Sequence, residues 1–277
     1  MEDGVKNEIV IEPGRRLERY WRDLWEYREL FAFLAWRDLL VRYKQTVFGV
    51  SWSVLRPLLT MIVFTLIFGK LAKLPSEGVP YPILVFAAML PWQFFANSVG
   101  DSSNSIVGNA PMISKIYFPR LLVLAGSMTA SLVDFLISFA ILALLMAWYR
   151  FLPGARIVAL PVFLSLIVLF SLGCSMWFAA LNVKYRDFRY VVPFILQAGL
   201  YISPVGFSSS IVPPEWRMVY SLNPMVGAIE GFRWALLAGD APFPWQAVVA
   251  SVVLSLLIFV SGFRYFRNTE RTFADII

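Results

Sequence analysis

The sequence predicts an all-α polytopic membrane protein with six transmembrane helices. An amphipathic helix precedes the first of them, and re-entrant helices lie between the fifth and the sixth. The 277 residues are 59% hydrophobic, and their mean hydropathy of +0.68 exceeds what a soluble domain of this length carries. The apolar residues form six runs of roughly spanning length. Lysine and arginine concentrate in alternate connections between these runs.

Missing residue types exclude several kinds of chemistry. The chain has no histidine, so the commonest metal ligand and general base is absent. Its single cysteine, Cys174, cannot support a disulfide framework. No glycine-rich phosphate loop ending in Gly-Lys-Ser or Gly-Lys-Thr occurs, so another chain must hydrolyse ATP if ATP drives this protein. We therefore expect no catalytic residue, no metal site and no cofactor in this chain.

The N-terminal segment divides into two parts. Residues 1–13 are acidic and polar, which indicates a flexible tail rather than a signal peptide. Residues 14–44 carry apolar and aromatic residues at helical spacing, with charged residues on the opposite face. This pattern predicts a helix lying in the membrane interface, ahead of a six-helix domain over 45–277. The alternative, a core helix of a soluble domain, has no soluble domain around it.

The first apolar run, 47–70, contains the dipeptide Arg56-Pro57 about two turns inside its start. Arg56 is the only charged residue between Val47 and Gly69. An arginine in the hydrocarbon core costs about 2.5 kcal/mol or more unless it pairs or reaches the headgroups. Arg56 therefore either extends to the cytoplasmic headgroups or lines a polar path at the mouth of a conduit. Pro57 frees a backbone carbonyl one turn back and allows a kink.

The other apolar runs are 80–104, 120–149, 157–182, 190–208 and 244–266. Between the last two, residues 209–240 alternate short apolar pieces with helix-breaking and charged residues. Two re-entrant helices facing protein or a cavity fit this pattern, and an ordinary extracellular loop is the alternative. In a homodimer such half-helices would meet near the two-fold axis and form an outer gate. The gate residues that we predict are Pro213, Pro214, Asn223, Pro224, Glu230 and Arg233, the last two forming an ion pair on one helical face.

The distribution of positive charge predicts the orientation. Seventeen of the 24 lysines and arginines fall in 1–44, the connections near 105–120 and 183–189, and the C-terminal tail. By the positive-inside rule these segments are cytoplasmic, both termini included, and the span count is even. The net charge of +6 then serves topology and anionic membrane lipids, so we expect no nucleic-acid partner.

Two groups of residues suggest binding surfaces. The loop 107–120 is bounded by Gly108 and Pro119, and its apolar residues Met112, Ile113, Ile116 and Tyr117 would share one side of a short helix. Such a helix could dock into the groove of a partner protein. The alternative is a plain turn with an interfacial helix and no partner. Aromatic residues near span ends or polar breaks either form interfacial belts or line a channel and stack on sugar rings. They are Trp92, Phe94, Phe95, Tyr201 and Phe207.

Asp134 lies in the middle of an apolar run, among Val133, Phe135 and Leu136. It must find a partner or a wet cavity, or stay protonated.

Three segments, in this order, carry a family resemblance: RYKQTVFGVSWSVLRPLL, FFANSVGDSSNSIVGNAPMISKIYFPR, and the stretch from NVKYRDFRYVVPF to GAIEGFRWALL. The chain resembles the membrane subunit of polysaccharide-exporting ABC transporters, a group that includes O-antigen, capsule and teichoic-acid exporters. The likeness runs from Arg37 to the C-terminus.

The resemblance implies a permease rather than an enzyme, located in the bacterial cytoplasmic membrane. It implies a homodimer with two ATPase subunits, which would bind the ATP and Mg, and a channel for a polyprenyl-pyrophosphate-linked, O-antigen-like polysaccharide. The family's first-helix motif falls on Gly49, Trp52, Arg56 and Pro57. Its coupling helix falls on Asn109, Pro111, Met112, Ile113, Ser114, Lys115, Ile116, Tyr117 and Phe118.

Under this resemblance Arg42, Lys44 and Arg56 lie where a lipid-carried pyrophosphate would meet the inner leaflet. The alternative for Arg42 and Lys44 is positive-inside anchoring. Two other functions stay open. One is an ABC permease for drugs or small lipids. The other is a membrane enzyme acting on polyprenyl lipids, for which clustered acids or histidines would be expected and none is evident.

Overall fold

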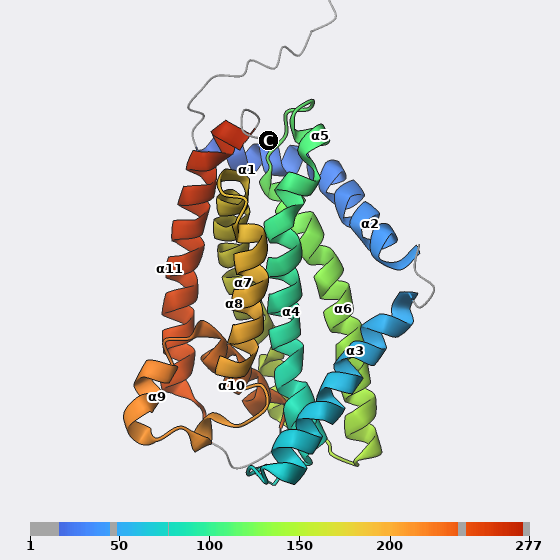
Figure 1. Ribbon diagram of the computed structural model, residues 1–277, viewed down its shortest axis with the longest axis vertical. Coiled ribbons are helices and arrows are strands. Elements are labelled where there is room, and N and C mark those ends of the chain that lie inside the picture. The colour runs from blue at the N-terminus through green and yellow to red at the C-terminus, as the bar shows by residue number, and fades with distance from the viewer. Residues whose placement is uncertain (1–16, 45–48, 77, 238–241, 274–277) are drawn as a thin grey trace, which may run out of the picture.

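The computed structural model describes residues 17–44, 49–76, 78–237 and 242–273, and every regular element in these ranges is a helix (Figure 1). The predicted tail 1–13 and the end of the predicted re-entrant segment, 238–240, lie outside the described residues.

The predicted N-terminal helix forms two helices, α1 (Leu17–Glu26) and α2 (Arg28–Lys44), which meet at Tyr27. Backbone hydrogen bonds continue across this junction, because the Tyr27 amide donates to the Asp23 carbonyl and the Phe31 amide donates to the Tyr27 carbonyl. Figure 1 shows α1 crossing one end of the helical bundle and α2 descending along its side. The helices bury Tyr20 and Leu34 against the bundle and leave Trp21, Trp25, Phe33 and Trp36 exposed. This distribution is typical of a helix at a membrane interface.

The first predicted span begins with α3 (Gly49–Phe64), which passes through Pro57 without ending. It continues as the π-helix η1 (Thr65–Leu71). Together they present many apolar side chains on the outside of the molecule, including Leu59, Ile62 and Leu66.

Four longer helices form the bundle: α4 (Tyr81–Gly108), α6 (Leu121–Trp148), α7 (Leu160–Lys184) and α11 (Trp245–Thr269). The central helix is α4. Of its most apolar 18 residues 78% are buried, compared with 17% for the corresponding stretches of α3 with η1 and of α11. It packs against α6 and α7, and α7 packs against α11. The last pair approaches closely at Gly173, where an added Cβ would lie 2.8 Å from the Phe259 backbone nitrogen. Small residues permit such backbone proximity between membrane helices.

The fifth predicted span, 190–208, is shorter than expected. It forms α8 (Phe188–Ile202), a helix of 15 residues, and the chain then leaves helical geometry at Ser203. Pro204 follows directly, and a residue before proline disfavours the helical conformation. Among the described residues, five helices are long and apolar enough to cross a membrane: Val54–Leu71, Tyr81–Gly108, Leu121–Trp148, Ala155–Lys184 and Trp245–Glu270.

Short elements occupy the two ends of the bundle (Figure 1). One end holds α1, the turn-like α5 (Ala110–Ile113), the α7–α8 connection and η4 (Glu270–Thr272). The opposite end holds η2 (Ala155–Ala159), η3 (Ser209–Ile211), α9 (Pro214–Tyr220) and α10 (Pro224–Leu236). Ten of the 13 residues of α10 are buried, and the helix packs against α4, α7 and α11 although it is too short to cross the bundle.

Candidate functional site

Lysine and arginine residues concentrate at one end of the bundle, in the alternate connections for which the sequence predicted them. Lys115, Arg120, Lys184, Arg186 and Arg189 belong to the end that holds α5. At this end the C-terminal segment is fastened to α6, because Glu270 accepts a hydrogen bond from the Arg120 amide at 2.9 Å and pairs with Arg267 at 3.0 Å. We call it the α5 end below.

The α5 segment is held by Asn109. Its side chain donates a 2.7 Å hydrogen bond to the Ser105 carbonyl, and its own carbonyl accepts from the Met112 and Ile113 amides. Pro111 occupies the first turn, where a missing amide proton leaves no hydrogen bond unmade. The helix ends at Ile113, so only part of the predicted segment 109–118 is helical.

The apolar residues of this segment divide into a buried and an exposed set. Ile113 and Phe118 are buried, whereas Ile116 is 59% and Tyr117 is 43% exposed. Ile113 therefore does not contribute to the exposed surface that Ile116 and Tyr117 form. The α-helix ends at Ile113, although the Ile116 amide still donates to the Met112 carbonyl at 3.1 Å. Ser114 and Lys115 are exposed with Ile116 and Tyr117, and these four residues form the projecting surface of the α5 end.

Arg42 joins three helices near the α5 end. Its guanidinium forms ion pairs with Asp101 of α4 and with Asp134 of α6, and the Tyr43 hydroxyl donates to Asp134 at 2.5 Å. These four side chains form the Arg42 cluster. Asp134 therefore has the partner that its position in an apolar run required. Arg42 is already neutralised by two carboxylates, so a pyrophosphate could bind it only in competition with them.

The other two cations predicted for pyrophosphate binding have different surroundings. Lys44 ends α2 and is exposed, and Arg56 is an exposed residue on α3. In the described part of the chain Arg56 makes no ion pair. Of Gly49 and Trp52, which belong to the same predicted motif, only the backbone is described.

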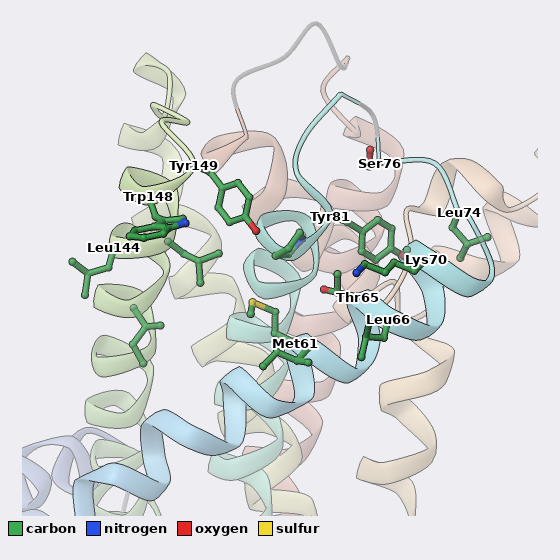
Figure 2. A pocket seen from close by; sticks show the side chains of 15 residues that line it. Met61, Thr65, Leu66, Lys70, Leu74, Ser76, Tyr81, Leu144, Trp148 and Tyr149 are labelled. Carbon is green, nitrogen blue, oxygen red and sulfur yellow. The ribbon is translucent and has the colours of Figure 1, made fainter.

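Two cavities lie at opposite ends. The first, of about 390 Å³, adjoins the Arg42 cluster and is lined by polar residues that include Asp38, Asp101, Asn104 and Asn109. The second, of about 820 Å³, lies between η1, α4 and α6 at the end away from α5 (Figure 2). Its lining is largely apolar, and its polar members include Thr65, Lys70, Ser76, Tyr81 and Tyr149. We call the second cavity the η1 pocket.

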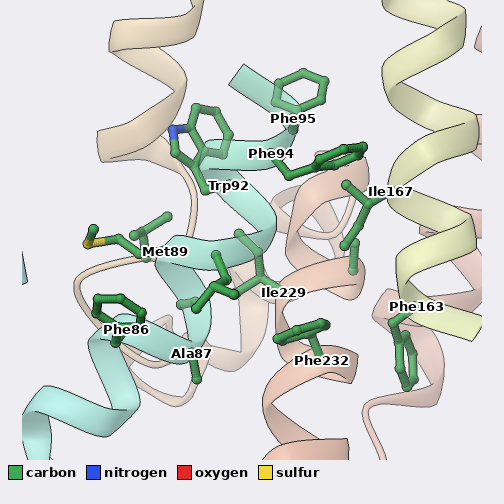
Figure 3. Close-up of a cluster of buried hydrophobic side chains, with 14 of the residues drawn as sticks. Phe86, Ala87, Met89, Trp92, Phe94, Phe95, Phe163, Ile167, Ile229 and Phe232 are labelled. Carbon is green, nitrogen blue, oxygen red and sulfur yellow. The ribbon is translucent and has the colours of Figure 1, made fainter. Parts of the chain in front are cut away.

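Three of the five predicted channel aromatics are core residues (Figure 3). Trp92, Phe94 and Phe95 are 5%, 2% and 6% exposed. Phe95 stacks on Phe170 with ring centroids 4.9 Å apart, and the Trp92 ring lies so close to Gly199 of α8 that an added Cβ would be 2.6 Å away. Their burial leaves no ring face open to a polymer, which corrects their assignment to a channel in this conformation.

Tyr201 and Phe207 have other environments. Tyr201 is 61% exposed near the end of α8. Phe207 is partly buried, and its carbonyl accepts a 2.8 Å hydrogen bond from Arg233. Of the predicted channel aromatics, Tyr201 is the one whose ring is well exposed.

Arg233 anchors the segment predicted to form the gate. It is 5% exposed and donates to the carbonyls of Leu84, Val205 and Phe207 at 3.2, 3.1 and 2.8 Å. The predicted pair with Glu230 is confirmed at 3.8 Å, and Glu230 also accepts from the Ser209 amide. Buried charge is tolerated here because carbonyls and a carboxylate surround the guanidinium.

The predicted prolines and asparagine lie at helix starts. Pro213 precedes and Pro214 begins α9, all of whose residues except Tyr220 are exposed. Asn223 caps α10 by accepting from the Met225 amide at 3.0 Å, and Pro224 is the first residue of that helix. The Asn223 side chain also donates to the Ser203 hydroxyl at 2.9 Å, which ties α10 to the end of α8.

Sequence reasoning missed two features. It did not connect Arg42 with its two carboxylates, which are 59 and 92 residues away in the chain. It also did not single out Lys70 and Thr65. The only available signal for the first was a carboxylate inside each of two apolar runs, Asp101 in 80–104 and Asp134 in 120–149. Nothing in the sequence pattern indicated the second. In the described residues no three His, Cys, Asp or Glu side chains gather as metal ligands.

Comparison with known proteins gives matches over most of the chain. The model of the ABC-2 type transporter family matches residues 29–237. The O-antigen export system permease protein RfbA of Myxococcus xanthus is 26% identical over 259 residues, which are 92% of this chain and 98% of that protein.

Two further relatives are also named as transport proteins for polysaccharides. The O-antigen export system permease protein RfbA of Klebsiella pneumoniae is 25% identical over 90% of this chain and 95% of that protein. The polysialic acid transport protein KpsM of Escherichia coli is 20% identical over 73% of this chain and 79% of that protein.

Proposed function

We infer that this chain, which belongs to the ABC-2 type transporter family, is the membrane subunit of an ATP-driven exporter of polysaccharide. One observation carries the inference: relatives named as O-antigen export permeases align over nearly the whole of this chain and nearly the whole of their own length. The chain is a permease subunit and not an enzyme, and a partner ATPase supplies ATP hydrolysis.

The finer features of this function extend the proposal. The exported polymer is an O-antigen-like glycan carried on polyprenyl pyrophosphate, and the exporter is a homodimer with two ATPase subunits that bind ATP and Mg. The chain spans the bacterial cytoplasmic membrane six times, α8 and the irregular residues after it forming the fifth crossing. Both termini are cytoplasmic, which is supported by the positive residues of the α5 end.

The α5 end is the docking surface for the ATPase in this proposal. Ile116 and Tyr117 project from it while Ile113 and Phe118 hold the segment to the bundle. The projecting apolar side chains can enter a partner's groove while the buried residues Ile113 and Phe118 keep the segment attached to the bundle. Because Asn109 joins α5 directly to the central helix α4, a displacement of α5 would reach the core of the bundle.

The substrate path is proposed to begin near α2 and α3 and to end at α9 and α10. Lys44 and Arg56 offer exposed positive charge for a pyrophosphate, and Arg42 becomes available when Asp101 or Asp134 releases it. The short buried helix α10, with its partner α9, forms the outer gate. Support comes from its length, its burial and its anchoring by Arg233.

Deletion of the gene in the native host tests the function. We expect the glycan to accumulate inside the cell on its lipid carrier and to return to the surface when the wild-type chain is supplied from a plasmid. Normal surface glycan in the deletion strain would contradict the proposal and favour a permease for drugs or small lipids. Glycan that is never assembled would instead indicate an enzyme acting on polyprenyl lipids.

A further inference from the structure

The π-helix η1 places two polar side chains together. A π-helix closes hydrogen bonds between residues i and i+5, so the fifth residue lies about one turn further along the same face. Thr65 and Lys70 are separated by five residues within η1. In an α-helix this separation would turn Lys70 well away from Thr65. Figure 2 shows the Lys70 side chain beside Tyr81, with its amine end toward Thr65.

The η1 pocket combines this polar pair with a long apolar wall. The pocket measures about 820 Å³, which is within the range of sites that bind small molecules. Its apolar lining comes from η1 and the preceding turn of α3 on one side and from α6 on the other. The residues are Met61, Ile62, Leu66, Ile141, Leu144 and Leu145.

The polar side of the pocket is suited to an anion. The Thr65 hydroxyl is buried and finds no hydrogen-bond partner within the described residues. Lys70 supplies a positive charge, and the Tyr149 hydroxyl points into the same space. The described residues that line the pocket include no carboxylate. A buried hydroxyl without a partner is costly, and a phosphate oxygen beside an ammonium group would satisfy it.

The position of the pocket identifies the source of the phosphate. Trp148 is the last residue of α6 and is 86% exposed, and Tyr149 follows it. An aromatic pair of this kind marks the membrane–water boundary at this end. Leu144 and Leu66, exposed at 72% and 45%, carry the lining onto the outer surface of the helices, where acyl chains lie. We propose that the η1 pocket binds an anionic phospholipid of the bilayer, with its phosphate at Lys70, Thr65 and Tyr149 and one acyl chain along α3 and α6.

This assignment depends on the chain spanning a membrane and not on the exported polymer. It also gives the π-helix a function, because regular α-helical winding of residues 65–71 would separate the phosphate ligands.

Lipid binding by the purified full-length chain tests the proposal. Native mass spectrometry would count dioleoyl phosphatidylglycerol and dioleoyl phosphatidylcholine retained from mixed micelles of equal lipid content. We expect phosphatidylglycerol to be retained preferentially and Lys70→Gln to weaken it about fivefold, as one lysine near a lipid phosphate contributes. Lys73→Gln is the matched control, because Lys73 is exposed three residues further on and does not line the pocket. Thr65→Val, which replaces the hydroxyl by a methyl group, should also weaken phosphatidylglycerol retention, because a hydrogen bond to the phosphate is lost.

Four outcomes would overturn the proposal. Equal losses in the Lys70 and Lys73 variants would mean diffuse surface attraction, and equal retention of both lipids would mean that the pocket does not select an anionic lipid. Displacement of the lipid by soluble glycerol 1-phosphate at equal concentration would identify a free-phosphate site. Tighter retention of undecaprenyl phosphate than of phosphatidylglycerol would assign the pocket to an isoprenoid lipid. If Lys70→Gln does not fold, the three comparisons made on the wild-type chain still stand, and undiminished phosphatidylglycerol retention by Thr65→Val would overturn the proposal.

Discussion

Arg42 shows how one side chain holds three helices near the α5 end. Its ion pairs with Asp101 and Asp134 connect α2 to α4 and α6. The three side chains are partly shielded, with 26%, 42% and 17% of their surfaces exposed. Removing one member of a shielded cluster leaves charges without compensation, which costs more than the intact pair contributes.

We predict that Arg42→Ala lowers the stability of the chain by about 2 kcal/mol, less than a fully buried pair would cost because the cluster is partly solvated. The measurement is the apparent midpoint of thermal unfolding in detergent. Arg37→Ala is the control, because Arg37 pairs only with its neighbour Asp38 among the described residues and such a pair contributes about 0–1 kcal/mol. Equal shifts for the two variants would show that the cluster has no special role.

Arg56 separates pyrophosphate binding from anchoring. We expect Arg56→Ala to insert normally, because Arg56 is exposed and makes no ion pair in the described residues, yet to reduce export about tenfold if it binds a pyrophosphate by charge-assisted hydrogen bonds. Surface glycan and the amount of chain in the membrane would be measured together. Normal export by a normally inserted variant would leave only the anchoring role.

At the scale of the element, α5 and α10 are both short helices that depend on the bundle for their position. Ile113 and Phe118 fasten the first, and Arg233 with Asn223 fastens the second. Short helices are marginal in isolation, so tertiary contacts decide whether they form. A variant at an anchor should therefore change stability, whereas a variant at a projecting side chain should change binding.

The projecting residues of the α5 end give the docking prediction. We expect Ile116→Asp combined with Tyr117→Asp to leave the fold intact and to abolish copurification of the ATPase, because two carboxylates would have to enter an apolar groove. Leu152→Asp is the control, since it makes the same kind of change at an 81% exposed residue of the opposite end. Intact copurification and intact ATPase stimulation in the double variant would reject docking at this surface.

The anchor of α10 gives a stability prediction. Arg233→Gln should lower the free energy of unfolding by about 2–4 kcal/mol, and lower the unfolding midpoint with it, because it leaves buried carbonyls and Glu230 without the guanidinium. Arg217→Gln is the matched comparison, because Arg217 also donates to two carbonyls, those of Val212 and Ser210, but on the exposed helix α9. Shifts of similar size would mean that burial does not set the contribution of Arg233.

At the scale of the whole molecule, the two ends of the bundle differ in charge and in content. The α5 end holds most of the cations, the proposed docking surface and the C-terminal segment, and the opposite end holds the η1 pocket, α9 and α10. From this difference and the positive-inside rule we predict that the α5 end faces the cytoplasm.

Cysteine labelling in whole cells tests that orientation. In a Cys174→Ser background, Leu152→Cys should react with a membrane-impermeant maleimide in cells whose outer envelope has been permeabilised. Leu152 would then face the outer side of the cytoplasmic membrane. Ser114→Cys, on the exposed surface of the α5 end, should react only after the cytoplasmic membrane is permeabilised. The reverse pattern would invert the topology and remove the ATPase from the α5 end.

The sequence by itself determined the helical class, the positions of the long membrane helices and the separation of charge. It also determined the pairing of Glu230 with Arg233. These properties depend on neighbours along the chain, on hydropathy over a window or on helical spacing, so they can be read locally.

Only the tertiary structure decided which helices are neighbours. It gave Arg42 two carboxylate partners from distant runs, placed Trp92, Phe94 and Phe95 in the core, and ended the α5 helix before Ile116. It also brought Lys70 over Thr65 through π-helical winding. Pairing and burial between residues far apart in the chain depend on how helices pack, and hydropathy carries no information about that arrangement.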